Sequence, residues 1–203
     1  YLQQALAEIV APTSQDSISE NHRIHQMMTD GYRMTYLDAD GQEHTPTVRI
    51  IGPEESDNEY LAVNQVTIVK GDFKRRFDIV LYCNGMPVSI MELKQAGAAQ
   101  IDISAAHAQL QTYLREFPLA FRFCVFNFIS DGLNAQYGTP FTPFNHFSPW
   151  NVDDDGTPVA LGHTVNGQAV LPIDTAISGL YNPTRFLQLL HSFTAFDAGA
   201  EGL

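Results

Sequence analysis

A short turn signal between two apolar runs constrains the fold of this chain more than any other feature. Asn84-Gly85 separates the run Phe77–Cys83 from the run Pro87–Lys94. Asn-Gly in this setting is typical of a tight hairpin, because both residues tolerate positive φ angles. We therefore expect residues 77–94 to form two neighbouring antiparallel strands.

The segments around this hairpin predict the fold class. Residues 60–69 have the composition of a strand, rich in Val, Ile and Thr. Residues 102–117 carry apolar side chains at helical spacing, and Pro118 ends the run. Residues 121–129 are again apolar and are expected to form a buried strand. The order strand, strand, strand, helix, strand predicts an α/β fold with a mixed central sheet flanked by helices.

The two ends of the chain add further elements. We expect helices at residues 2–10, from Ser17 or Ser19 to Asp30, and at 183–196; strands at 32–37 and 47–51; and a small hairpin at 165–168. The composition changes after Trp150, which suggests a domain over residues 1–150 and a linker over 151–203. The first residue is not Met and lies in a helical pattern, so we expect a piece of a longer polypeptide.

Composition limits what this chain binds. Its 11 Lys and Arg residues against 23 Asp and Glu residues give a net charge of -12, which opposes autonomous binding to nucleic acid. The local exception is the basic run of Lys70, Lys74, Arg75 and Arg76, which we take as candidate DNA contacts. No apolar run reaches the ~20 residues of a membrane helix, and no membrane partner is expected.

The two cysteines, Cys83 and Cys124, lie in apolar runs. We expect them to be buried free thiols of a cytoplasmic protein, although a disulfide between them is the open alternative.

Residues capable of catalysis lie within the hairpin. Side chains alternate along a strand, so Glu92 and Lys94 share one face. If Asp78 faces the same way, the two carboxylates lie ~5 Å apart and repel unless a cation separates them. Oxygen ligands with open positions suit Mg²⁺, which would activate water and offset phosphate charge. Lys94 would orient or deprotonate the water, or neutralise the phosphate.

The hairpin register sets a condition on this hypothesis. A regular two-residue turn pairs Cys83 with Met86, which places Asp78 and Glu92 on opposite faces. A catalytic site therefore requires a three-residue loop or a β-bulge near residues 84–87. The alternative is a solvated strand end, which a chance Glu-x-Lys triplet would favour. The apolar setting favours a site, because unpaired charges in such strands are costly.

Longer motifs carry a resemblance to a known family. The runs L-A-V-N-Q-V-T-I-V (61–69), R-R-F-D-I-V-L-Y-C-N-G-M-P-V-S-I-M-E-L-K (75–94) and I-S-D-G-L (129–133) resemble the nuclease region of the restriction (R, or HsdR) subunit of type I restriction enzymes. The resemblance extends over nearly the whole chain. It implies a PD-(D/E)xK fold of the RecB-like branch, in which Asp78, Glu92 and Lys94 match the catalytic signature and Phe77 replaces the signature proline.

The resemblance also implies a function and partners. It implies Mg²⁺-dependent hydrolysis of double-stranded DNA in a complex with modification and specificity subunits. The family's subunit is an ATP-driven translocase, and no G-x-x-x-x-G-K-[ST] phosphate loop occurs in this chain. We therefore expect ATP to act in a motor region outside this sequence, toward which residues 151–203 lead.

Further candidates surround the signature. Gln109 and Tyr113 fit a Q-x-x-x-Y motif that RecB-like relatives carry on the following helix, with core packing of Tyr113 as the alternative. Glu20 is a candidate third metal ligand or part of a solvated helix face. Asn64 and Gln65 are candidate DNA contacts or braces of the site, or simply strand surface. His22 and His25 are more simply explained as surface or packed side chains than as metal ligands.

Two other functions fit the same sequence features. One is a non-catalytic assembly module with a nuclease fold, which would bind no metal between Asp78 and Glu92. The other is a stand-alone junction or repair nuclease, which the acidic composition and the expected C-terminal helix disfavour.

Overall fold

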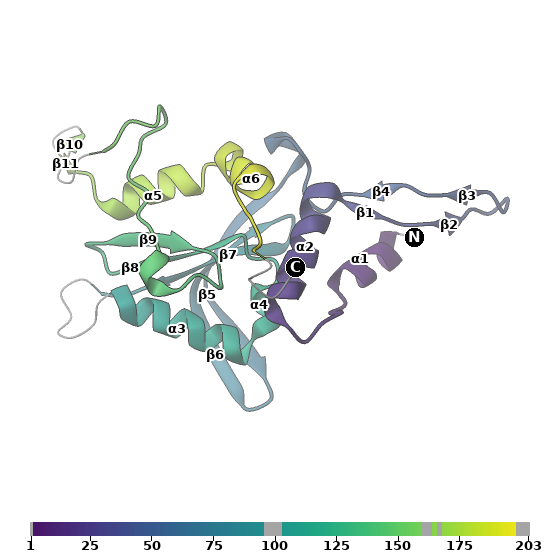
Figure 1. Ribbon diagram of the computed structural model, residues 1–203, viewed down its shortest axis with the longest axis horizontal. Coiled ribbons are helices and arrows are strands. Elements are labelled where there is room, and N and C mark those ends of the chain that lie inside the picture. The colour runs from purple at the N-terminus through teal and green to yellow at the C-terminus, as the bar shows by residue number, and fades with distance from the viewer. Residues whose placement is uncertain (1, 96–102, 160–163, 166–167, 198–203) are drawn as a thin grey trace.

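A five-stranded sheet forms the centre of the computed structural model, which describes residues 2–95, 103–159, 164–165 and 168–197. Its strand order is β5-β6-β7-β8-β9, and only the β7–β8 pair is parallel. The strands are β5 (Tyr60–Lys70), β6 (Phe73–Cys83), β7 (Met86–Leu93), β8 (Phe126–Ser130) and β9 (Ala135–Gly138). The predicted α/β class with a mixed sheet and flanking helices is confirmed (Figure 1).

The crossover between the parallel strands covers one face of the sheet. It contains α3 (Ile103–Glu116) and the short α4 (Pro118–Phe121), since parallel neighbours need a long connection. The apolar face of α3 buries Ala106, Leu110 and Tyr113 against Phe77 and Ile90 of the sheet. The helix predicted over 102–117 is confirmed from Ile103, and Asp102 lies outside the described residues.

Helices from both ends of the chain cover the other face. These are α2 (Ser17–Asp30), α5 (Pro172–Leu180) and α6 (Pro183–Ser192), while α1 (Leu2–Val10) lies against α2. Figure 1 shows α5 and α6 on the side of the sheet opposite α3. The expected linker segment therefore supplies core residues, among them Ala176, Leu180 and Leu190, each at 0% exposure. That residues 151–203 lead toward a motor stays a prediction.

A narrow two-stranded arm extends from this body. It consists of β1 (Tyr32–Arg33) with β4 (Thr47–Val48), and β2 (Tyr36–Leu37) with β3 (Glu43–His44). The strands expected at 32–37 and 47–51 are thus found as short pairs, and Figure 1 shows them projecting past α2. Gly31, with φ of 81°, lies where the arm leaves α2 and has no room for a Cβ atom beside Thr47.

One predicted strand is wrong in its first half. The run Phe121–Ile129 was expected to be extended throughout, but α4 ends at Phe121 and β8 begins only at Phe126. The Asn21 amide donates hydrogen bonds to the carbonyls of Phe121, Arg122 and Cys124. These backbone carbonyls, which form no strand ladder in this buried bend, thereby gain a hydrogen-bond partner. A run of buried apolar residues does not distinguish a strand from a packed turn, which explains the error.

Smaller elements complete the chain. The 3-10 turns η1 (Glu55–Asp57) and η2 (Phe144–His146) lie in loops, and β10 (Thr164–Val165) with β11 (Gln168–Ala169) forms the expected hairpin. The last predicted helix ends at Ser192 instead of 196. Cys83 and Cys124 are buried free thiols, as predicted. Among the helices described, none is long and apolar enough to cross a membrane.

Candidate active site

A bulge in β7 brings Asp78 and Glu92 opposite each other. The turn at Asn84-Gly85 is the regular two-residue form, with positive φ at both residues. The register then shifts, leaving Val88 as an extra residue of β7. The pairs are Cys83↔Met86 and Tyr82↔Pro87 before the shift, and Leu81↔Ser89, Val80↔Ile90 and Ile79↔Met91 after it. The irregularity that a catalytic site requires is therefore present, one residue beyond the expected segment 84–87.

The side-chain contacts place both carboxylates on the face that α3 covers. Ile90 packs into the α3-side core, and Glu92, two residues on, shares its face. Phe77 and Val80 both pack into that core although they are three residues apart, whereas Ile79 contacts the opposite core. Asp78 is two residues from Val80 and therefore shares its face, the α3 side. Because its neighbour Phe77 packs on this side as well, the alternation of β6 is interrupted at Asp78.

Among the described residues, the Asp78 carboxylate is contacted from both neighbouring strands. Its Oδ2 accepts a hydrogen bond of 2.9 Å from the backbone N–H of Leu93. Its Oδ1 lies 3.5 Å from the Nε2 atom of Gln65, which is long for a hydrogen bond. The contact from Leu93 is a main-chain interaction, so no residue type in the sequence could have indicated it.

Glu92 is a buried carboxylate, and one of its two oxygens lacks a hydrogen-bond partner among the described residues. It is 2% exposed, and its Oε1 accepts from Lys94 Nζ at 2.7 Å. Its Oε2 is buried and has no hydrogen-bond partner among the described residues. Burial raises the pKa of Glu92 to about 7, against the lowering effect of Lys94, and the charge of Asp78 raises this pKa further. An unpartnered buried oxygen is rare enough to require an explanation.

A chain of hydrogen bonds joins this pair to α3 and back to β6. Lys94 Nζ donates to Gln109 Oε1 at 2.5 Å, Gln109 Nε2 donates to the Tyr113 hydroxyl, and Tyr113 donates to the Arg76 carbonyl at 3.4 Å. Tyr113 is also core, at 3% exposure, and burial raises its pKa. The structure thus brings together Asp78, Glu92, Lys94, Gln109 and Tyr113. Tyr113 packs in the core, and its functional role stays a prediction.

The donor set suits a hard divalent cation. Mg²⁺ is typically held by one or two carboxylates, with waters and phosphate oxygens completing the octahedron. Asp78 and the free Oε2 of Glu92 provide two such ligands from neighbouring strands. Within the described part of the chain, no group of three or more His, Cys, Asp or Glu side chains could hold a metal. Two carboxylates on adjacent strands could therefore hold Mg²⁺ with water or phosphate oxygens as its other ligands.

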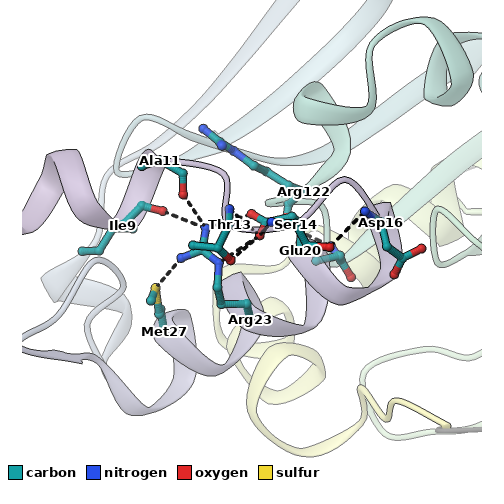
Figure 2. A network of polar contacts seen from close by, with 10 residues as sticks. Ile9, Ala11, Thr13, Ser14, Asp16, Glu20, Arg23, Met27 and Arg122 are labelled. Carbon is teal, nitrogen blue, oxygen red and sulfur yellow. Dashed lines mark hydrogen bonds and ion pairs between the residues drawn. The ribbon is translucent and has the colours of Figure 1, made fainter.

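Glu20 has other partners. Figure 2 shows its carboxylate enclosed by the loop before α2. Oε1 accepts from Thr13 and Ser14, and Oε2 accepts from Arg23 Nη2 at 2.8 Å. The hydrogen bond from Arg23, first among several, lowers the pKa of Glu20 to about 2. None of these contacts joins Glu20 to Asp78 or Glu92.

The two histidines of α2 pack against the C-terminal segment. His22 stacks on Phe196 with ring centroids 4.4 Å apart, and His25 Nε2 lies 2.9 Å from the Leu190 carbonyl. Their positions agree with the packed alternative that the sequence favoured.

The basic run begins at the end of β5 with Lys70, and its three members in β6 lie on both faces of that strand. Arg75 faces α3 and forms an ion pair of 2.7 Å with Glu116, a partner that the sequence reasoning missed. Lys74 and Arg76 are exposed, as are Asn64 and Gln65 of β5. Lys70, at the end of β5, lines a cavity of about 250 Å³ together with Glu20 and Arg122. Lys70 is also exposed, so Lys70, Lys74 and Arg76 are the members open to a ligand, whereas Arg75 is engaged by Glu116.

A mixed sheet flanked by helices, with two acidic side chains and a lysine meeting on adjacent strands, places this chain in the restriction-endonuclease-like fold class. The family model "Type I restriction enzyme R protein N terminus" matches residues 2–146. The chain belongs to this family.

Individual relatives agree with the family model. The chain is 29% identical over 190 residues to the type I restriction enzyme HindI endonuclease subunit of Haemophilus influenzae, covering 92% of this chain and 17% of the relative. A Methanocaldococcus jannaschii protein named for the type I restriction enzyme MjaIXP is 26% identical over 85% of this chain and 18% of its own length. The SauCOLORF180P endonuclease subunit of Staphylococcus aureus is 33% identical over 39% of this chain and 8% of its own. The chain thus spans less than a fifth of the length of these relatives.

Proposed function

We propose that this chain is the Mg²⁺-dependent endonuclease domain of a type I restriction subunit, a PD-(D/E)xK nuclease that hydrolyses phosphodiester bonds of double-stranded DNA. The observation that carries the proposal is that Asp78, Glu92 and Lys94 meet on adjacent strands, where the Oε2 of Glu92 is buried without a hydrogen-bond partner among the described residues. A buried Glu92 beside a second, half-buried carboxylate has little value as packing, because burying charge is costly. The same arrangement is useful for cation binding.

Each residue has a role in this proposal. Asp78 and Glu92 hold the cation, with Asp78 oriented by the Leu93 N–H. When bound, Mg²⁺ supplies a Lewis acid that activates water and offsets phosphate charge. Lys94 orients or deprotonates the attacking water, or neutralises the phosphate. Gln109 fixes Lys94 from α3, and Tyr113 anchors Gln109 to β6.

The relatives suggest where the substrate comes from. Their names assign them to type I restriction enzymes, and we propose the same setting here, in the cytoplasm, with modification and specificity subunits as partners. ATP is then used by a motor region of the complete subunit. A net charge of -12 fits a domain to which DNA is delivered by other parts of the complex.

Substitution of the carboxylates tests the proposal directly. In the complete restriction complex, Asp78→Ala and Glu92→Ala are expected to abolish DNA cleavage while ATP hydrolysis continues, because the motor lies elsewhere. Glu20→Ala is the control: it removes a buried carboxylate that has no contact with the pair, so at a temperature where it stays folded it is expected to retain cleavage. Near-normal cleavage by Glu92→Ala would rule out this mechanism and favour the assembly-module alternative.

A further inference from the structure

Gln65 has an unusual backbone for the middle of a strand. Its φ is 56°, and Asn84 is the other non-glycine residue with positive φ among those described. Asn84 occupies a hairpin turn, where positive φ is required. Gln65 lies inside β5, between residues that keep their ladder pairs. A strained residue outside a turn persists only where the surrounding structure enforces it, and such residues cluster at functional sites.

The strain lies directly opposite Asp78. The ladder pairs Asn64 with Ile79 and Val66 with Phe77, so Gln65 faces Asp78 across the strands without any inserted residue. Val66 packs into the α3-side core, as does Phe77, its partner on β6. The left-handed residue in β5 and the interrupted alternation of β6 therefore occur at the same position along the sheet.

The side chain of Gln65 completes the contacts of Asp78. Its amide Nε2 approaches Oδ1 from β5, while the Leu93 N–H holds Oδ2 from β7. Both oxygens are thus contacted from the two neighbouring strands. A neutral amide beside Oδ1 brings no positive charge that would compete with a cation for the Asp78 carboxylate.

We propose that Gln65 is a positioning residue, whose left-handed backbone and side-chain amide together hold the Asp78 carboxylate toward Glu92. The inference rests on the proposed function, since it assigns Gln65 to the cation site of the nuclease. It also selects among the three sequence hypotheses for Gln65: it is a brace of the site, in preference to a DNA contact or a surface residue.

Three substitutions of Gln65 separate the contribution of its backbone conformation from that of its side-chain amide. Gln65→Gly accepts positive φ but lacks the amide, Gln65→Ala lacks both properties, and Gln65→Asn keeps an amide on a residue that tolerates this φ. Thr67→Gly is the matched control, because it places glycine at an exposed position of the same strand. Thermal melts report folding. Calorimetric titration of Mn²⁺ into the nucleotide-free complete subunit, with Asp78→Ala as the baseline, reports the cation site.

We expect Gln65→Gly to weaken Mn²⁺ binding about 10-fold, in the range found when supporting residues of metal sites are changed, without lowering the melting temperature. Gln65→Ala should weaken binding at least as much and also lower the melting temperature, and Gln65→Asn should restore part of the affinity. Thr67→Gly should lower the melting temperature and leave Mn²⁺ affinity unchanged.

The possible failures are distinguishable. If the unsubstituted subunit shows no Mn²⁺ binding beyond the Asp78→Ala baseline, the proposed function and this inference both fall. If Asp78→Ala removes binding but Gln65→Gly retains wild-type affinity, only the inference is overturned. Equal weakening by Thr67→Gly would show a general effect of glycine in β5 and would overturn it as well.

Discussion

Glu92 is buried and has a single ion-pair partner among the described residues. Lys94 supplies the only hydrogen bond to its carboxylate among the described residues. Removing one partner of such a pair leaves an uncompensated buried charge, whereas removing both can be close to neutral. Alternation along the strand predicted that Glu92 and Lys94 share a face. That Glu92 would keep an unpartnered oxygen could not be predicted, because it depends on packing from α3 and β6.

The first prediction concerns this pair. Lys94→Met is expected to destabilise the folded chain by about 2 kcal/mol at pH 8, where Glu92 is mostly charged, less than the ~3–5 kcal/mol of a broken buried pair because Glu92 can take up a proton. Adding Glu92→Gln should recover most of the loss. Urea unfolding of the single and double variants measures both values. Additive losses in the double variant would show that the two side chains do not stabilise each other.

The second prediction concerns Glu20, whose pKa is lowered in the fold to about 2. A carboxylate with a lowered folded pKa stabilises the protein above its unfolded pKa of ~4.3 and loses this effect as the pH falls toward the folded value. Glu20→Gln is therefore expected to cost about 2 kcal/mol at pH 7, as for other buried charged hydrogen-bond groups. The cost should shrink steadily between pH 4 and pH 2 in denaturant titrations. A cost that does not change with pH would contradict the ion pair with Arg23.

At the scale of elements, the hairpin and its bulge set the geometry of the site. The Asn84-Gly85 turn was predictable from two residues, and the bulge was predictable only as a condition for function. Its position at Val88 depends on which side chains fit the two cores. The same limit explains the misassigned strand at Phe121 and the unpredicted β9 and α5: burial determines these elements, and local pattern does not reveal it.

The third prediction concerns the turn. Asn84 has φ of 49°, and its side chain bonds Glu59 N–H, the Ile50 carbonyl and Asn58. Asn84→Gly keeps the backbone and loses these bonds, which should cost about 1–2 kcal/mol. Asn84→Ala adds the strain of a left-handed residue, about 1 kcal/mol more. Chemical denaturation of both variants tests the order. Equal stability of the alanine and glycine variants would show that the turn does not impose positive φ.

The whole molecule combines an acidic surface with a small exposed basic patch. The net charge of -12 follows directly from the sequence. The sequence did not indicate that Arg75 lies on another face than Lys74 and Arg76, because this depends on its ion pair with Glu116. Likewise, the change of composition after Trp150 suggested a linker, and the structure shows α5 and α6 packed into the core. Long-range packing of this kind has no local sequence signal.

The fourth prediction concerns DNA. This chain alone is expected to bind duplex DNA weakly, with affinity that falls as salt rises. In the complete complex, Lys74→Glu with Arg76→Glu should weaken DNA engagement without lowering the melting temperature, because exposed charges contribute little to stability. Filter binding at two salt concentrations and thermal melts test both parts. Tight, salt-insensitive binding by the chain alone would show that the DNA contacts lie elsewhere.

A crystal structure of the chain grown with Mg²⁺ would show whether Asp78 and Glu92 form a cation site. We expect one Mg²⁺ between the two side chains, with the Oε2 of Glu92 and one oxygen of Asp78 at about 2.0–2.1 Å from the ion. Lys94 should remain within reach of Gln109. An ordered, metal-free carboxylate pair at saturating Mg²⁺, or the ion bound at Glu20 instead, would show that Asp78 and Glu92 do not form this site.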